Sequence, residues 1–187
     1  MKSQVRIIGG KWRGSKIPVI DADGLRPTPD RIRETLFNWL ASNCPGATVL
    51  DCFAGTGVLG FEALSRGAGR LVALERDPAA LASLRRQAAR FDPDAIEIIA
   101  GDSLDSIARL RHKFDLVFID PPYAASGLRH QVIERLEATA CLQPGARIYF
   151  EWPGTGDFEL PSPRLHWLKR KSAGQVNYAI AEWRLVG

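Results

Sequence analysis

Short apolar runs alternate with helical segments between residues 47 and 152, and this alternation constrains the fold more than any other feature. The apolar runs predict strands at 47–53, 70–75, 95–100, 114–120 and 146–152. Helical spacing and turn residues predict helices at 57–66, 78–90, 103–110 and 127–138. Strands that are apolar throughout are typical of a parallel sheet covered on both faces. The chain is therefore predicted to be an α/β protein, with helices on both faces of a mostly parallel sheet.

The C-terminal part follows a different pattern. Residues 165–173 and 176–185 are predicted to be two strands joined by a short turn that contains Gly174. We expect these strands to form an antiparallel hairpin at one edge of the sheet. Residues 154–164 contain several prolines and glycines and predict a variable loop, to which no function is assigned.

The N-terminal part precedes the alternation and is basic. Segments 5–8 and 16–20 predict a small hairpin, and 28–41 predicts a helix with Pro29 at its first position. Residues 1–20 include five Lys or Arg residues and no acid. This bias favours a polyanionic partner, because basic side chains bind phosphates by displacing counterions, although it could also serve solubility alone. We expect a basic extension over residues 1–45 and an α/β domain over residues 46–187.

Composition argues against several classes of protein. Apolar residues make up 45% of the chain, which suits a packed core rather than disorder. No apolar run approaches the roughly 18 residues that span a bilayer, and the N-terminus lacks the apolar stretch of a secretory signal. Three widely spaced cysteines, Cys44, Cys52 and Cys141, suggest neither a disulfide framework nor a metal site. We therefore expect buried thiols in a reducing cytosol, and neither a membrane nor a metal.

A glycine-rich turn follows the first strand of the alternation. The segment DCFAGTGVLG, residues 51–60, contains GxGxxG between a strand and a helix. Glycines at such a turn permit a tight bend and close approach of a ligand. Glu75 ends the next strand, where a carboxylate can accept hydrogen bonds from two ribose hydroxyls. We predict that Gly55, Gly57 and Glu75 bind a nucleoside cofactor; a structural turn with an unrelated acid is the alternative.

Two cofactors could fit this turn, a nicotinamide dinucleotide or S-adenosylmethionine. Asp51 precedes Gly55 by four residues and could hold the cationic amino group of a methionine moiety, whereas it would repel a pyrophosphate. Asp102 and Ser103 could bind adenine, or they could simply cap the following helix. Phe53 could face the sulfonium, or it could be part of the core. This pattern favours S-adenosylmethionine.

The strand at 114–120 runs directly into Asp120-Pro121-Pro122-Tyr123. Two prolines fix two φ angles and remove two N–H donors, so the segment is stiff and presents acceptors in fixed directions. Acceptors held in this way suit the binding of an amino group, although a rigid turn that merely ends a strand is the alternative. The first reading is favoured by the glycine turn, Glu75 and Asp102, which precede it in the order that a cofactor site requires.

The DPPY segment resembles the (Asp/Asn)-Pro-Pro-(Tyr/Phe) motif of class I amino-methyltransferases. The resemblance implies that the Asp120 carboxylate and the Pro121 carbonyl accept the two protons of an exocyclic amino group. These bonds would stabilise positive charge on the nitrogen as the methyl group arrives. Tyr123 would stack on the base and hold it in line with the S–CH3 bond. In a folded RNA, the target base would first have to leave its stack.

The resemblance extends over nearly the whole chain and becomes more specific at the N-terminus. RIIGGKWRG (6–14) and LRPTPDRIRETLFNWL (25–40) are similar to the N-terminal signature of RsmD-type enzymes. That family methylates N2 of one guanine in bacterial 16S ribosomal RNA. The resemblance implies a Rossmann-like class I methyltransferase fold. It also implies that four residues near the N-terminus lie at the mouth of the active site: Arg26, Thr28, Arg31 and Arg33.

We therefore predict an RNA-binding surface in the N-terminal extension. Lys11 and Arg13 could bind phosphates, and Trp12 between them could stack on an unpaired base or pack the hairpin onto the core. Arg26, Arg31 and Arg33 would add phosphate contacts. The expected partner is 16S rRNA within a small ribosomal subunit or an assembly intermediate, in the cytoplasm, with the enzyme as a monomer. The alternatives are an adenine or other amino methyltransferase acting on DNA or a different RNA, and a non-catalytic assembly factor.

Overall fold

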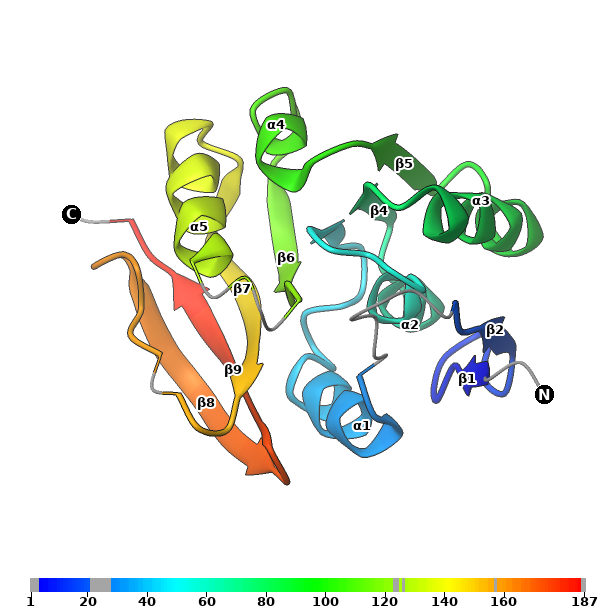
Figure 1. Cartoon of the computed structure of the whole chain (residues 1–187), viewed down its shortest axis with the longest axis horizontal. Helices are drawn as coiled ribbons and strands as arrows, with labels where there is room; N and C mark the ends of the chain where they lie inside the picture. Colours follow the sequence, from blue (N-terminus) through cyan, green and yellow to red (C-terminus); the bar gives the residue numbers. More distant parts are fainter. Residues whose placement is uncertain (1–3, 21–27, 123–124, 126, 157, 186–187) are drawn as a thin grey trace.

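A seven-stranded mixed sheet forms the centre of the computed structural model, which describes residues 4–20, 28–122, 125, 127–156 and 158–185. Its strands lie in the order β5-β4-β3-β6-β7-β9-β8 (Figure 1). Five strands are parallel, namely β3 (Thr48–Asp51), β4 (Arg70–Glu75), β5 (Ile96–Ala100), β6 (Phe114–Ile119) and β7 (Leu142–Pro153). The last two, β8 (Leu165–Ala173) and β9 (Val176–Trp183), form an antiparallel hairpin at one edge. The predicted sheet is confirmed.

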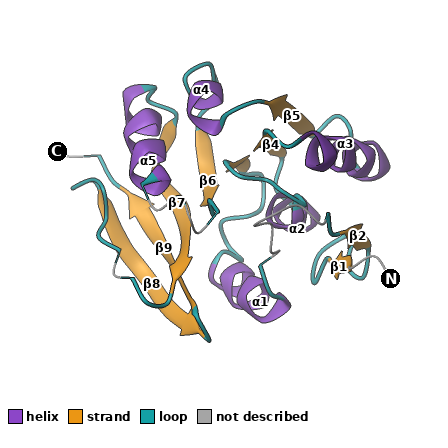
Figure 2. Cartoon of the chain, viewed as in Figure 1, coloured by secondary structure: helices purple, strands orange, loops and turns teal. Residues whose placement is uncertain are grey.

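Helices cover both faces of this sheet (Figure 2). They are α1 (Asp30–Trp39), α2 (Val58–Ser65), α3 (Pro78–Phe91), α4 (Ser103–Ile107) and α5 (Leu128–Ala138). Alternate residues of each strand enter different cores, because successive side chains of a strand point to opposite faces. Val49 packs in a cluster with apolar residues of α1 and α2, whereas Leu50 packs in a second cluster with residues of α4 and α5. The prediction of a sheet buried on both faces is therefore confirmed.

The predicted N-terminal hairpin pairs β1 (Gln4–Arg6) with β2 (Lys16–Pro18). Its loop is fixed to α2, since the backbone N–H groups of Ile8 and Gly9 each donate to the Glu62 carboxylate at 2.8 Å. Gly10 has a φ of +78°, and a Cβ there would lie 1.8 Å from the Ser65 carbonyl oxygen. Only glycine suits this position, which explains the Gly9-Gly10 pair in the sequence.

The hairpin and α1 share a core with the sheet. Ile7, Ile17 and Phe37 are fully buried in the same cluster as Val49 and Phe61. The extension over residues 1–45 is therefore packed against the α/β domain over its described part. The boundary at residue 46 stays a prediction.

Two elements begin two or more residues away from the predicted position. α1 begins at Asp30, because Pro29 has an extended ψ of 148° and takes the N-cap position rather than the first helical one. Strand β7 begins at Leu142 rather than at residue 146, since Leu142 pairs with Phe114 ahead of a register shift. The exposed Pro144-Gly145 pair was expected to precede the strand, but a strand can continue past such residues where its pairing is irregular.

Two further predictions concern cysteines and membranes. Cys44, Cys52 and Cys141 are buried free thiols, as expected. Burial raises the pKa of Cys44 to about 11, so this thiol is protonated at neutral pH. Within the described ranges, no helix has the length and apolar character required to cross a membrane.

Candidate active site

The predicted site residues Asp51 and Asp120 lie where the strand order reverses. Strands β3 and β6 are neighbours, yet the chain proceeds from β3 toward one sheet edge and from β6 toward the other. In α/β sheets, ligands bind in the crevice at the carboxyl ends of two such strands. Asp51 is the last residue of β3, and Asp120 directly follows β6. The Cys52 N–H donates to the Phe118 carbonyl at 3.1 Å and keeps the two strand ends together.

The glycine turn between β3 and α2 has the geometry that its sequence predicts. Gly55 and Gly57 have φ values of +53° and +79°, which are unfavourable for residues that carry a Cβ atom. A Cβ on Gly57 would also lie 2.5 Å from side-chain atoms of both Leu84 and Phe61. A Cβ on Gly60 would lie 2.6 Å from Leu71, so this glycine lets α2 pack closely on β4.

Glu75 holds the turn from the neighbouring strand. One carboxylate oxygen accepts from the Gly55 N–H at 2.7 Å, and the other accepts from the N–H groups of Arg76 and Asp77 at 2.8 Å. Two carboxylate oxygens offer about four acceptor positions, so three bonds leave capacity for another donor. The side chain is buried at the carboxyl end of β4, beside the turn. Its predicted contact with ribose hydroxyls stays a prediction.

Asp102 and Ser103 lie at the N-terminus of α4, next along the same sheet edge. Asp102 caps the helix by accepting from the Leu104 N–H at 2.9 Å, and its residue is exposed. The buried Ser103 hydroxyl donates to the Cys52 carbonyl at 2.5 Å, which ties α4 to the end of β3. The capping alternative is therefore present, and adenine binding stays a prediction. Phe53 is half-buried and packs against the second core cluster, as its core alternative predicts.

Asp51 is buried at this edge, with 4% of its surface exposed. The pKa of its carboxyl is raised from 3.8 to about 7, chiefly by burial and also by the charge of Glu75. Hydrogen bonds from the backbone of Phe53 and Gly60 act in the opposite direction. A cation placed beside Asp51 would favour its ionised form, so the site suits an ammonium group.

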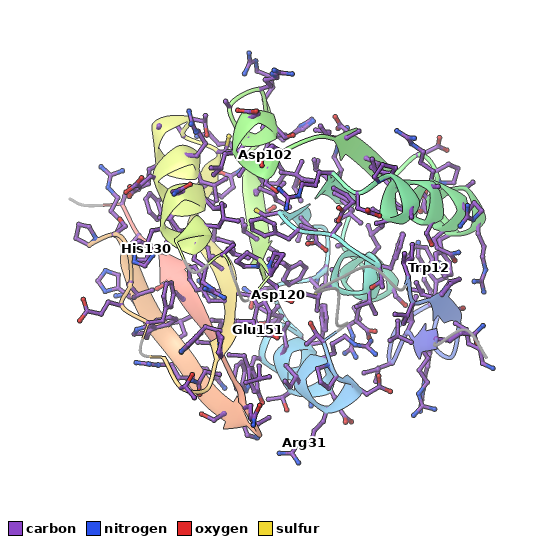
Figure 3. All side chains as sticks on the ribbon, viewed as in Figure 1. Trp12, Arg31, Asp102, Asp120, His130 and Glu151 are labelled. Carbon is purple, nitrogen blue, oxygen red and sulfur yellow. The ribbon has the colours of Figure 1, made fainter. Side chains whose placement is uncertain are left out.

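Asp120 lies next to another acid, Glu151 (Figure 3). Burial raises the pKa of the Asp120 carboxyl well above its ordinary value, and the charges of Glu151 and Asp51 raise the pKa further. Arg129 and the Thr28 side chain oppose this shift without cancelling it. Three carboxyl groups thus share one end of the sheet, which is an environment that favours positively charged ligands.

Three side chains near Asp120 were not predicted from the sequence, namely Glu151, Tyr149 and Arg129. Glu151 is buried on β7 and accepts from the Tyr149 hydroxyl at 2.8 Å. Arg129 is buried on α5, and its Nε donates to the Glu151 backbone carbonyl at 2.7 Å. A sequence signal existed for Arg129, because it precedes the apolar residues Val132 and Ile133 by three and four positions and therefore lies on the buried face of the helix.

The predicted RNA-binding residues Lys11, Arg13 and Arg31 are exposed. Trp12 stacks on Phe91 with ring centroids 4.5 Å apart, and the Lys11 ammonium lies 4.4 Å from its ring centroid. The ring is therefore engaged by the protein, as the packing alternative predicts. Figure 3 shows Trp12 beside the hairpin and Arg31 on α1, on different sides of Asp120. Tyr123 and Arg26 lie outside the described residues.

Arg33 does not fit the prediction of an RNA contact. Its side chain has no exposed surface and forms ion pairs with Asp30 and with the fully buried Glu62, the latter at 3.3 Å. It also donates to the backbone carbonyls of Arg6 and Thr28 at 2.9 Å and 3.1 Å. The sequence did not distinguish buried Arg33 from exposed Arg31, because both residues flank apolar Ile32. We therefore assign Arg33 a structural role, joining the hairpin, α1 and α2.

Other parts of the structure offer weaker candidates. A hollow of about 310 Å³ lies at the other end of the strands, away from their carboxyl ends, and is lined by turn residues around Pro45, Asp115 and Pro144. Asp115 accepts there from the Thr48 N–H at 2.8 Å, which is a structural contact between strand ends. In the portion of the chain that the structure covers, no group of three or more His, Cys, Asp or Glu side chains could hold a metal.

The fold is that of the class I methyltransferases. A structure with this fold from Streptococcus mutans, provisionally described as a SAM-dependent methyltransferase, aligns with a TM-score of 0.72 at 16% identity. It covers 90% of this chain and 53% of that chain. The yhhF protein of Escherichia coli, provisionally described as a methyltransferase, has a TM-score of 0.90 at 37% identity, over 97% of this chain and 99% of that one.

The family model described as Conserved hypothetical protein 95 matches residues 5–182, and the chain belongs to this family. The chain is also similar to the ribosomal RNA small subunit methyltransferase D of Escherichia coli K12. The two are 42% identical over 179 residues, which is 95% of this chain and 89% of that protein. The predicted membership of the RsmD-type family is therefore confirmed.

Proposed function

We propose that this protein transfers a methyl group from S-adenosylmethionine to the exocyclic N2 of a guanine in small-subunit ribosomal RNA. Methyltransferase activity on ribosomal RNA is supported by the 42% identical relative, which is named for it. The cofactor is supported by the fold and by the SAM-dependent description of the Streptococcus mutans structure. The guanine N2 position extends the RsmD-type resemblance and is the finer part of the proposal.

One observation supports the chemistry most strongly: a buried acid and a half-buried acid lie at the ends of adjacent parallel strands, at the switch point of the sheet. Asp51 lies at the end of β3 beside the glycine turn, and Asp120 lies at the end of β6. The two carboxyls are close enough for the charge of Asp51 to raise the pKa of Asp120. In the proposed complex, Asp51 binds the amino group of the methionine moiety, and Asp120 binds the amino group of the base.

The protein residues act mainly by positioning. S-adenosylmethionine supplies an electrophilic methyl group on a cationic sulfur. Glu75 and the turn at Gly55 and Gly57 would fix the nucleoside, because their backbone and carboxylate positions are set by hydrogen bonds and left-handed φ angles. Asp120 and the Pro121 carbonyl would orient the amino nitrogen and stabilise its developing positive charge.

Basic residues of the extension would bind the RNA backbone. Lys11, Arg13 and Arg31 are exposed and sit on a hairpin and helix that are packed against the domain. Their contacts would be with phosphates, which determine affinity and orientation but not sequence. The whole extension is small, so the target guanine would be selected by the fold of the RNA or by a ribosomal particle in the cytoplasm.

A transfer assay tests the proposal. Labelled S-adenosylmethionine is offered with naked 16S rRNA, small ribosomal subunits or DNA, and the labelled nucleoside is identified by mass spectrometry. The expected product is N2-methylguanosine in rRNA. Asp120→Ala should lower transfer at least about 100-fold while cofactor affinity is retained, and the exposed Asp94→Asn is the matched control.

The same assay separates the alternatives. A product of N6-methyladenine, in DNA or RNA, would replace guanine by adenine as the substrate. Binding to rRNA without transfer to any of the three substrates would favour a non-catalytic assembly factor. The adjacent acids Asp51 and Asp120 and the intact glycine turn favour catalysis over that second function.

A further inference from the structure

Glu151 is a buried acid next to Asp120, and the proposed methyl transfer does not yet use it. In the parallel pairing of β6 with β7, Phe118 is opposite Tyr149 and Ile119 is opposite Phe150. Asp120 and Glu151 are the next residues along, so their side chains leave the sheet side by side on one face. Glu151 is 5% exposed. Asp120 is half-buried, and two adjacent acids that are shielded from water are costly unless the site stabilises or uses their charge.

The hydrogen bonds around Glu151 hold it in one position. The Tyr149 hydroxyl donates to its Oε2 at 2.8 Å, and the Thr28 hydroxyl lies 3.5 Å from the same oxygen. The Thr28 side chain is also near enough to Asp120 to lower the pKa of that carboxyl, so this one hydroxyl is close to both acids. Thr28 remains outside α1, because the extended Pro29 delays the start of the helix.

Among the residues that the structure describes, the charged and hydrogen-bonding groups that act on Asp120 come from four parts of the fold. Asp51 lies at the end of β3, Glu151 on β7, Arg129 on α5 and Thr28 before α1. Burial is the largest cause of the raised pKa of Asp120, and the charge of Glu151 is the second largest. Arg129 opposes this shift, but its Nε is bonded to the backbone of β7. Asp120 is therefore a stronger proton acceptor than an ordinary aspartate.

We propose that Glu151 is a positioning residue for Asp120, and that together with Thr28 it prepares Asp120 to accept the proton released by the methylated nitrogen. This inference rests on the proposed function. In that reaction the nitrogen lone pair forms the new N–C bond, while the electrons of the S–C bond remain on sulfur. The nitrogen then carries a positive charge and loses one proton, which passes to a carboxylate oxygen of Asp120.

A glutamine at position 151 would keep a similar shape and hydrogen bonds but remove the charge. Its effect therefore separates the proposed role from a purely structural one. Without the charge of Glu151, Asp120 should titrate at lower pH and become a weaker proton acceptor. Removing the Thr28 hydroxyl should have the opposite effect on the titration, because that hydroxyl lowers the pKa of Asp120.

The first measurement does not depend on activity. The carboxyl groups of the protein without cofactor are labelled with carbon-13 and titrated by NMR, and Asp120 is assigned with Asp120→Asn. Glu151→Gln should move its titration to lower pH, Thr28→Val should move it to higher pH, and Thr28→Ser should leave it near the wild-type position. Exposed Glu159→Gln is the control. An Asp120 titration that does not respond to Glu151→Gln overturns the inference. If that variant does not fold, Thr28→Val and Thr28→Ser are compared instead, and the same Asp120 titration in both overturns the inference.

The second measurement is the pH profile of single-turnover methyl transfer with saturating cofactor. Glu151→Gln should lower the limiting rate about 10-fold or more and move the acidic limb to lower pH. A lower rate with an unmoved limb would indicate a structural role and contradict the proposal. Failure of the wild-type protein to methylate any RNA would refute the proposed function instead, while the NMR titration would still test the coupling of Glu151 to Asp120.

Discussion

The perturbed carboxyl of Asp51 predicts how cofactor affinity depends on pH. Burial raises its pKa from 3.8 to about 7 in the folded protein. A difference of about three units corresponds to about 4 kcal/mol in favour of the protonated form. Because the folded-state pKa is the higher one, the protein without cofactor should lose stability as the pH rises from about 4 through about 7. A bound ammonium group should reverse this loss by favouring the charged carboxylate.

Affinity for S-adenosylmethionine should therefore rise with pH. Below pH 7 the ionised fraction of Asp51 falls about tenfold per pH unit, so binding at pH 6 should be about tenfold weaker than the maximum. The cofactor's own α-amino group loses its proton near pH 7.7 to 8.0, by analogy with other α-amino groups. Maximal affinity is expected between these two values, with weaker binding on either side.

Calorimetric titrations between about pH 5.5 and about pH 9, at constant ionic strength, would measure this profile. Asp51→Asn should bind more weakly and lose the acidic limb, while the exposed Asp94→Asn should keep the wild-type profile. Methylthioadenosine lacks the amino acid moiety, so its affinity for the wild type and for Asp51→Asn should not fall at acidic pH. The reasoning is wrong if Asp51→Asn keeps the limb, or if wild-type affinity is the same at pH 6 and pH 7.

Three further outcomes follow from contacts described above. Glu62→Gln should destabilise the protein by about 3 kcal/mol in urea unfolding, because buried Arg33 loses its buried carboxylate partner and keeps only the half-exposed Asp30; exposed Arg31→Gln should change stability little. Gly57→Ala should cost roughly 1–3 kcal/mol and weaken cofactor binding in calorimetry, since its φ is +79° and its Cβ would clash. Replacing Lys11 and Arg13 by Gln should reduce the slope of log affinity for rRNA against log salt concentration by about 1.4, and an unchanged slope would show that they do not bind phosphates.

The sequence predicted the sheet because its signals are local. Strands such as Phe114–Ile119 are continuously apolar, and helices such as Pro78–Phe91 begin at a proline and keep one apolar face. The glycine turn could also be predicted, since a positive φ at Gly55 and Gly57 is a property of those residues themselves. The strand-helix order then brings Asp51 and Asp120 to the same edge, because parallel strands joined by crossovers have their carboxyl ends together.

The partners of these acids were harder to predict. Glu151 and Asp120 are 31 positions apart, and their proximity depends on the register between β6 and β7, which no local pattern specifies. Arg33 and Arg31 differ by two positions in one helix, so one is buried and the other exposed. The two arginines carry the same charge in the sequence. Arg33 is structural because it lies on the face of α1 that meets Glu62, whereas Arg31 lies on the exposed face and remains a candidate RNA contact.

The N-terminal extension contacts the candidate active site, and is not only a surface that could bind RNA. Thr28 reaches the pair formed by Asp120 and Glu151, and Arg33 bonds the Thr28 carbonyl at 3.1 Å while pairing with Glu62 on α2. Since α2 begins at the glycine turn, the same contacts connect the hairpin to the predicted cofactor site. This arrangement gives a physical reason why the extension and the α/β domain occur in one chain: the basic surface has a fixed position relative to the acids that carry out the proposed chemistry.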